Sequence, residues 1–280
     1  MDAPLFDAKD QAGVPPAHGI RVGIGGWTFA PWRDDFYPAG LVQRRELEYA
    51  SRMLSAIEIN GTFHRAQKPA TYAKWASQVP AGFVFSVKAP MRIVQARELG
   101  GTGGQVEAFL AGITALGDTL GPIVWQFDRG GRLRREDLAA FVDLLPASID
   151  GRVLRHVLDV RDPGVVDAGF LALARRRGIA FVFTDSTDHP SFADTTADFV
   201  YARLMRARAD VATGYRASEL AAWARRARTW ADGGEPDDLP RIAPPVPGGK
   251  RRDVFIFFIS AAKERNPAAA MALIRKLQTT

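Results

Sequence analysis

The stretch SAIEINGTFHRAQKPATYAKWASQVPAGFVFSVK, residues 55–88, decides the fold because it contains one strand–helix–strand unit. Its two ends, 55–60 and 83–88, are short apolar runs rich in β-branched and aromatic residues, which is typical of buried strands. Between them, residues 70–78 follow Pro69, a residue that suits the first turn of a helix. Two buried strands joined through a helix predict a parallel pair.

The same unit repeats along the chain. Strands are predicted at 20–25, 55–60, 83–88, 122–127, 152–160, 179–184, 198–204 and 253–259. Helices are predicted at 45–54, 70–78, 104–116, 135–145, 165–177, 217–230 and 266–277, whereas 186–197 is too short and polar for a full helix. This alternation predicts an α/β fold, an eight-stranded parallel (β/α)8 TIM barrel, with the helix after strand six short or missing. An open doubly wound sheet is the competitor, but GIGGWTF (23–29) only weakly resembles its glycine-rich phosphate turn.

Composition predicts one barrel domain over residues 20–280, preceded by a flexible leader, residues 1–19, that has little periodicity. Residues 231–252, rich in proline, glycine and charge, are predicted to form a long exposed loop before the last strand. The chain has 47% hydrophobic and 24% charged residues, ordinary values for a globular protein with a sizeable core. With no cysteine, it can form no disulfide, thiolate metal site or cysteine nucleophile.

No apolar run approaches the roughly 20 residues that cross a bilayer, and the N-terminus lacks the apolar segment of a signal peptide. We therefore expect no membrane partner and a cytoplasmic location, and leave the oligomeric state open. The net charge of +6 allows nucleic acids or phosphorylated metabolites as partners. Because the arginines are scattered and many sit at helical spacing, a solvated basic surface explains the same charge.

Polar side chains gather where the predicted strands end, which is where barrel enzymes carry their active sites. Strand alternation places Glu58 with Asn60, and Asp159 with Arg161, on common faces. Three carboxylates and three cations are thus predicted at one mouth: Glu58, Asp159, Asp185, Lys88, Arg161 and Arg203. Gln126 ends the fourth strand. Such a ring either neutralises itself, as a structural cap on the core, or serves a ligand.

Several motifs in order resemble the DUF72 (YecE-like) family over residues 20–277. They are GIGGWTFAPWRDDFYP (23–38), EINGTFHR (58–65), PAGFVFSVKAP (80–90) and GPIVWQF (121–127), followed by Tyr215 and Trp223. The resemblance implies a TIM barrel related to sugar-isomerase and endonuclease IV-like barrels, and leaves the reaction open.

The chain departs from the family pattern at several positions. His64 stands where a tyrosine is usual, and Asp159 and Asp162 replace a glutamate and a histidine. RLMRAR (203–208) lacks the usual His-Gly, and FFISAAKERNP (257–267) lacks a pair of asparagines after its aromatics. The chain is therefore identified as a divergent member.

The candidate catalytic residues are Glu58, Lys88, Asp159 and Asp185. Glu58 beside Lys88 supplies a base and an electrophile for acid–base chemistry, unless the two simply form an ion pair. The candidate substrate-binding residues are Trp27, Asn60, His64, Arg65, Gln126, Arg161, Arg203 and Tyr215. Among them, Arg65, Arg161 and Arg203 suit a phosphate or carboxylate. The aromatic first loop around Trp27 either packs over the mouth or stacks on a ring of the ligand.

Cofactors remain open. Carboxylates suit Mg²⁺ or Mn²⁺, but His18, His64, His156 and His189 show no metal-ligand spacing, so a multi-zinc site is not expected. His156 is expected to pack inside a strand. No nucleotide-cofactor signature occurs.

The leading hypothesis is an enzyme, of isomerase, lyase or hydrolase type, acting on a small anionic, sugar-phosphate-like substrate. The alternatives are a nucleic-acid-binding or phosphodiester-processing protein and a ligand-binding barrel that has lost catalysis.

Overall fold

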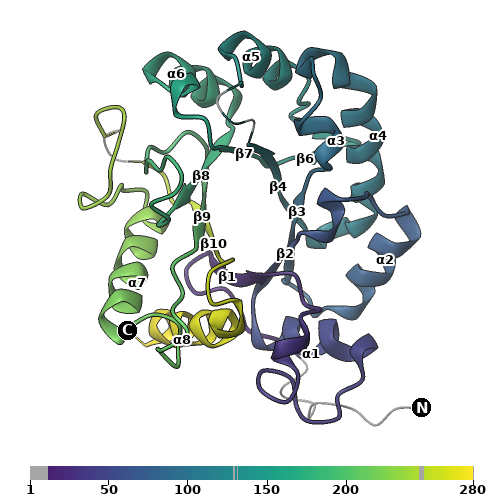
Figure 1. Ribbon diagram of the computed structural model, residues 1–280, viewed down its shortest axis with the longest axis vertical. Coiled ribbons are helices and arrows are strands. Elements are labelled where there is room, and N and C mark those ends of the chain that lie inside the picture. The colour runs from purple at the N-terminus through teal and green to yellow at the C-terminus, as the bar shows by residue number, and fades with distance from the viewer. Residues whose placement is uncertain (1–11, 129, 131, 246–248, 280) are drawn as a thin grey trace.

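Eight parallel strands close into one barrel. The computed structural model describes residues 12–128, 130, 132–245 and 249–279. The barrel strands are β1 (Ile20–Gly25), β2 (Ala56–Ile59), β3 (Val84–Lys88), β4 (Leu120–Phe127), β7 (His156–Val160), β8 (Ala180–Thr184), β9 (Phe199–Leu204) and β10 (Asp253–Phe258). Around the ring they follow the order β1-β10-β9-β8-β7-β4-β3-β2, and β2 pairs with β1 to close it (Figure 1). The predicted (β/α)8 barrel is confirmed.

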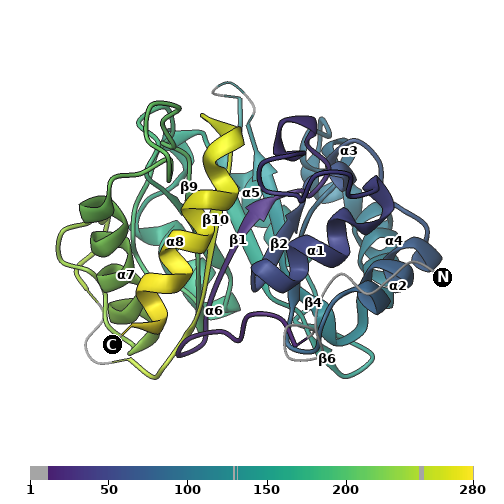
Figure 2. The same ribbon diagram turned by 90° about the horizontal axis from the view of Figure 1, so that it is seen from below.

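The helices surround the ring of strands (Figure 1). They are α1 (Glu46–Met53), α2 (Pro69–Gln78), α3 (Met91–Val94), α4 (Gly103–Ile113), α5 (Arg135–Asp143), α6 (Ala168–Arg177), α7 (Ala217–Ala231) and α8 (Asn266–Gln278). In the side view of Figure 2, α8 runs along the barrel wall beside β1. Among the described residues, no helix combines the length and the apolar character that crossing a bilayer requires.

The connection from β8 to β9, residues 185–198, contains no helix, as predicted for this position. The loop between α7 and β10 holds this connection in place. The Asp194 carboxylate accepts hydrogen bonds from the backbone amides of Ile242 (2.8 Å) and Ala243 (2.9 Å), and Glu235 accepts one from the amide of Thr195 (3.0 Å). Residues 246–248 of the predicted loop lie outside the described residues.

The predicted strand 152–160 is wrong in its first half. Residues Arg152–Val153 form β6, which pairs antiparallel with β5 (Ser148–Ile149), and the barrel strand β7 begins only at His156. Asp150 and Gly151 form the turn with φ of 49° and 77°. An Asp-Gly pair favours this left-handed backbone, and it therefore folds the chain into a hairpin before the barrel strand starts.

Residues 1–11 of the predicted leader lie outside the described residues. The following residues run along one end of the barrel (Figure 2). Val14 and Ala17 pack against the hydrophobic core, and the amide of Ile20 donates to the carbonyl of Ala17.

Two apolar layers form the core. The larger lies between the strands and the helices, and the smaller fills the barrel interior. Alternate residues of each strand point inward, so that β9 contributes Phe199 and Tyr201 to the interior and Arg203 above them. The Tyr201 ring stacks on Phe257 with centroids 5.0 Å apart. Gly23 of β1 lets the backbone of β2 approach closely, since a Cβ there would lie 2.0 Å from the carbonyl oxygen of Ala56, and it would also lie 3.3 Å from the Phe257 ring.

Candidate functional site

Arg203 occupies the centre of the charged side chains at the C-terminal ends of the strands. It is only 3% exposed. Its Nε donates to Glu58 Oε2 (2.9 Å), while Nη1 donates to Asp159 Oδ2 (2.6 Å) and Gln126 Oε1 (3.0 Å). Burial alone would lower the pKa of Arg203, but the two carboxylates outweigh burial and raise it. The guanidinium therefore stays charged, and the two carboxylates share its single positive charge.

Glu58 lies fully buried on β2, next to β1 and β3 in the ring. Its Oε2 accepts a second hydrogen bond, from the Tyr201 hydroxyl, which also lies 2.8 Å from Ser86 Oγ. Burial and the Glu58 charge raise the pKa of Tyr201, so this hydroxyl stays protonated and can donate. Glu58 Oε1 is buried without a hydrogen-bond partner among the described residues, and is thus a vacant acceptor.

Arg161 links the buried network to the surface. Its Nε lies 3.5 Å from Asp159 Oδ2 and its Nη1 lies 3.2 Å from Asp128 Oδ2. Asp128 is half exposed, so this ion pair lies at the solvent-exposed edge of the site. Exposed ion pairs contribute little to stability, so the contact with Asp128 holds Arg161 only weakly.

Lys88 and Lys263 are the cations of this site that no described carboxylate contacts. Lys88 Nζ lies 3.9 Å from the centre of the Phe63 ring, and Lys263 Nζ lies 4.5 Å from that of Phe29. Burial, followed by the Arg203 charge, lowers the pKa of Lys88 to about 8, although Glu58 and Asp159 act in the opposite direction. Burial also lowers the pKa of Lys263. The alternative considered for Lys88, an ion pair with Glu58, does not form; Glu58 pairs with Arg203.

A cavity of about 350 Å³ lies among these groups. Its lining includes Glu58, Asn60, Lys88, Gln126, Arg161, Arg203, Met205, Ile259, Ser260, Lys263 and Asn266. Gly25 of β1 also lines it, and a Cβ there would lie 2.7 Å from Asn60 Nδ2, so glycine lets the Asn60 amide approach. We call this space the C-terminal pocket.

Lys263 and Asn266 were not predicted as site residues. Ser260 and Ala261, directly after β10, have φ of 63° and 47° and turn the chain back over the barrel. Asn266, the first residue of α8, is 1% exposed; its Nδ2 donates to the Ser260 carbonyl (3.4 Å) and its Oδ1 has no described partner. Left-handed backbone at serine and alanine has no clear sequence signal, so this turn was not foreseeable.

Asp185 and Tyr215 were predicted at the pocket, but the structure places them in a separate group. Asp185 accepts hydrogen bonds from the Met205 amide (2.6 Å) and the Tyr215 hydroxyl (2.9 Å). The Tyr215 hydroxyl in turn accepts from the Arg206 amide (2.7 Å). Burial raises the pKa of both residues. Together they fix the chain that leaves β9.

The remaining predicted residues also lie outside the C-terminal pocket. Trp27 packs edge-on against Trp75, with ring centroids 5.0 Å apart, and its carbonyl accepts from the Tyr37 hydroxyl. This is the packing alternative for the aromatic first loop. His64 and Arg65 are exposed on the segment after β2 and do not line the cavity.

The described residues contain no group of three or more histidine, aspartate or glutamate side chains placed to hold a metal ion. His156 has a packing role, as expected. Its Nδ1 accepts from Trp125 Nε1 (3.1 Å), and its Nε2 lies 2.8 Å from the Pro146 carbonyl and donates to it. Burial lowers the pKa of His156 to about 4, so the ring is neutral at physiological pH.

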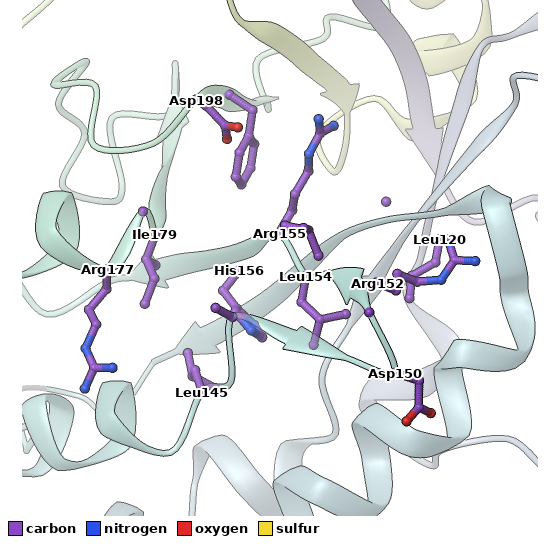
Figure 3. Close-up of a pocket in the computed structure, with 16 residues that line it drawn as sticks. Leu120, Leu145, Asp150, Arg152, Leu154, Arg155, His156, Arg177, Ile179 and Asp198 are labelled. Carbon is purple, nitrogen blue, oxygen red and sulfur yellow. The ribbon is translucent and has the colours of Figure 1, made fainter.

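A larger cavity, of about 980 Å³, lies at the opposite end of the barrel beside the β5–β6 hairpin (Figure 3). Its three arginines are all engaged in ion pairs: Arg152 with Asp118, Arg155 with Asp253 and Arg177 with Asp143. In barrels of this type the N-terminal ends of the strands serve stability, and active sites lie at the C-terminal ends. Size therefore does not make this cavity the functional site.

Fold and site together define the class of protein: a closed parallel (β/α)8 barrel with a charged pocket at the C-terminal ends of its strands. The DUF72 family model, described as a protein of unknown function, matches residues 21–280. The chain belongs to the DUF72 family.

Solved structures of the same family share the fold. A DUF72 protein of Thermotoga maritima is 16% identical, with a TM-score of 0.70, over 93% of this chain and 99% of that one. A DUF72 protein of Enterococcus faecalis is 15% identical, with a TM-score of 0.64, over 93% of this chain and 98% of that one. A comparison with curated proteins finds no match.

Proposed function

We propose that the protein is an enzyme that binds a small anionic, sugar-phosphate-like molecule in the C-terminal pocket and acts on it by acid–base chemistry. The observation that carries this proposal is the pair of lysines, Lys88 and Lys263, which line one cavity and touch no described carboxylate.

The charges around the pocket favour an anion. Arg203 and Arg161 pair with three carboxylates, those of Glu58, Asp159 and Asp128, so the two lysines leave an excess of one positive charge. Their lowered pKa values mean that the protonated lysines are held in surroundings that disfavour charge. A phosphate or carboxylate between them would relieve that cost, because an opposite charge stabilises each ammonium group.

The vacant acceptors point to hydroxyl groups on the same ligand. Glu58 Oε1 and Asn266 Oδ1 are buried beside the cavity, and no donor in the described part of the chain reaches them. Leaving a buried acceptor unpaired costs about 1–3 kcal/mol, which a ligand hydroxyl would recover. The cavity volume of about 350 Å³ suits a molecule of sugar-phosphate size.

Acid–base chemistry is assigned to Lys88 and Glu58. Because the pKa of Lys88 lies at about 8, its amine exchanges protons near neutral pH. The free Oε1 of Glu58 is available to hold a substrate proton, while Arg203 and Tyr201 fix Oε2. A metal is not required by this assignment; Mg²⁺ or Mn²⁺ would need ligands from the substrate in addition to these carboxylates.

The test is a calorimetric titration with glycerol 2-phosphate, which carries a phosphate and two hydroxyls. We expect Lys88→Gln and Lys263→Gln each to weaken binding roughly tenfold or more, because each removes one cation from the pocket. Lys74→Gln removes the same charge from an exposed position on α2 and should bind as the wild type does. Equal affinities for all four proteins would rule the anion pocket out.

The two alternatives are outcomes of the same series. Oligonucleotide binding with a steep salt dependence, insensitive to Lys88→Gln and Lys263→Gln, would favour a nucleic-acid-binding surface. Tight phosphate binding with no turnover of any sugar phosphate would favour a barrel that binds but no longer catalyses.

A further inference from the structure

The surroundings of Lys88 fix the base of its side chain and place its amine among charged groups of the C-terminal pocket. It ends β3 and lines the pocket, where Arg203, Glu58, Asp159 and Arg161 all act on its charge. The Lys88 carbonyl accepts from Thr62 Oγ1 (2.6 Å), and the following amide, of Ala89, donates to the Val124 carbonyl (2.8 Å). The base of this side chain is thus fixed, while Nζ lies over the face of Phe63, 3.9 Å from the ring centre.

We propose that Lys88 is a covalent nucleophile that forms a Schiff base with an aldehyde or ketone group of the anionic substrate. This inference rests on the proposed anion pocket and narrows its substrate to a carbonyl compound. A lysine becomes nucleophilic when its amine is desolvated or lies near another cation, and Lys88 meets both conditions through its burial and Arg203.

The step balances without an oxidant or reductant. The unprotonated Nζ attacks the carbonyl carbon, and the π electrons of the C=O bond move to oxygen. One proton passes from nitrogen to that oxygen to give a carbinolamine. A second proton, from solvent, lets the hydroxyl leave as water while the nitrogen lone pair forms the C=N⁺ bond. The product carries the same single positive charge as protonated Lys88, and Glu58 and Asp159 already stabilise charge at this position.

Protonation distinguishes Lys88 from an ordinary lysine. With a pKa of about 8, roughly a tenth of the molecules carry a neutral Lys88 at neutral pH. Lys263 lines the same pocket but has no cationic neighbour that lowers its pKa, since burial alone acts on it. Lys263 is therefore the better anchor for the substrate anion, and Lys88 the better nucleophile.

The experiment traps the Schiff base by reduction. The full-length protein is incubated with glyoxylate, a small anionic aldehyde, and cyanoborohydride, and the carboxymethylated lysines are located by peptide mass spectrometry. We expect Lys88 to be modified at least roughly tenfold faster than Lys263 or the exposed Lys74, with a rate that rises with pH and levels off above a midpoint near 8. Glycolaldehyde, a neutral aldehyde of similar size, should show a smaller preference for Lys88, because the lowered pKa still favours this lysine but the positive charge of the pocket no longer draws the aldehyde to it.

Matched variants separate the covalent step from anion binding. Lys88→Arg keeps the charge and should abolish the preferred adduct, whereas Lys74→Arg should leave it unchanged. Excess glycerol 2-phosphate should protect Lys88. Modification of the lysines in proportion to their exposure would overturn the inference. If glycerol 2-phosphate still binds in that case, the anion pocket stands and only the Schiff base is wrong; if it does not bind, both are wrong.

Discussion

Arg203 determines how two buried carboxylates are tolerated in one barrel. Its guanidinium contacts Glu58, Asp159 and Gln126 at once, and 3% of the residue is exposed. A charge buried at this depth is costly unless it is paired, and each carboxylate depends on the same partner. The arginine is therefore a structural requirement of the site before it is a ligand-binding group.

Arg203→Met should lower the free energy of unfolding by about 3–5 kcal/mol, because it leaves Glu58 and Asp159 buried without their shared cation. Urea unfolding followed by circular dichroism measures this loss. Arg226→Met is the matched control, since Arg226 forms its ion pair with Asp238 near the surface and should cost under about 1 kcal/mol. Similar losses in the two variants would contradict the account of Arg203.

Because His156 is buried in its neutral form, the free energy of unfolding should depend on pH. Its folded-state pKa of about 4 lies below the unfolded value, so the unfolded chain binds the extra proton first as pH falls. Stability is therefore lost as pH decreases from about 6.5 to 4, by up to about 3 kcal/mol. Unfolding measured across this range should show the loss in the wild type, and a weaker one in His156→Gln. His64→Gln, at an exposed position, should follow the wild type; parallel curves for all three proteins would contradict this role.

At the scale of single elements, the connection between β8 and β9 replaces a helix with a loop fastened by side chains. Asp194 binds two backbone amides of the loop before β10, and Glu235 binds Thr195. The Glu235 bond satisfies a backbone amide of the connection, and the Asp194 bonds satisfy two amides of the loop against which the connection lies.

Asp194→Ala should destabilise the protein by about 1–3 kcal/mol, since it leaves the amides of Ile242 and Ala243 without their acceptor. Thermal unfolding and amide hydrogen exchange at these two positions test it. Asp188→Ala, in the same connection but exposed, should change stability by under about 0.5 kcal/mol. Unchanged exchange at Ile242 and Ala243 in the Asp194 variant would show that other contacts fasten the loop.

Strand alternation explains which site residues could be predicted. Lys88 and Arg203 are in phase with the inward residues Val84 and Tyr201, and both line the C-terminal pocket. Asp159 is in phase with Val157 and binds Arg203 there, although it does not itself line the cavity. Asp185 is out of phase with the inward Val182, and it turns away to bind Met205 and Tyr215.

The barrel itself was predictable because each buried strand is a distinct apolar run. The β5–β6 hairpin could not be recognised, because its second strand belongs to the same apolar run, 152–160, as β7. Lys263 and Asn266 could not be foreseen, because the left-handed turn at Ser260 and Ala261 brings them over the pocket. The ion-pair partner of Glu58 could not be predicted from the sequence either. Strand alternation placed Lys88 beside Glu58, but Arg203, from a strand that is not adjacent, pairs with Glu58.

For the whole molecule, the two ends of the barrel differ in the size of their cavities and in whether the cations there are paired. The N-terminal end holds the larger cavity (Figure 3), whose three arginines form ion pairs. The C-terminal end holds the smaller pocket, where two lysines contact no carboxylate of the described residues. The net charge of +6 draws anions to the protein in general, and we propose the C-terminal pocket as the place where one binds.

The most direct test is a crystal structure of the protein with glycerol 2-phosphate. The account predicts that the phosphate lies in the C-terminal pocket, within hydrogen-bond distance of Lys88 Nζ or Lys263 Nζ, with a hydroxyl near Glu58 Oε1. A phosphate bound instead among Arg152, Arg155 and Arg177 at the other end of the barrel, or a C-terminal pocket without the ligand at saturating concentration, would contradict it.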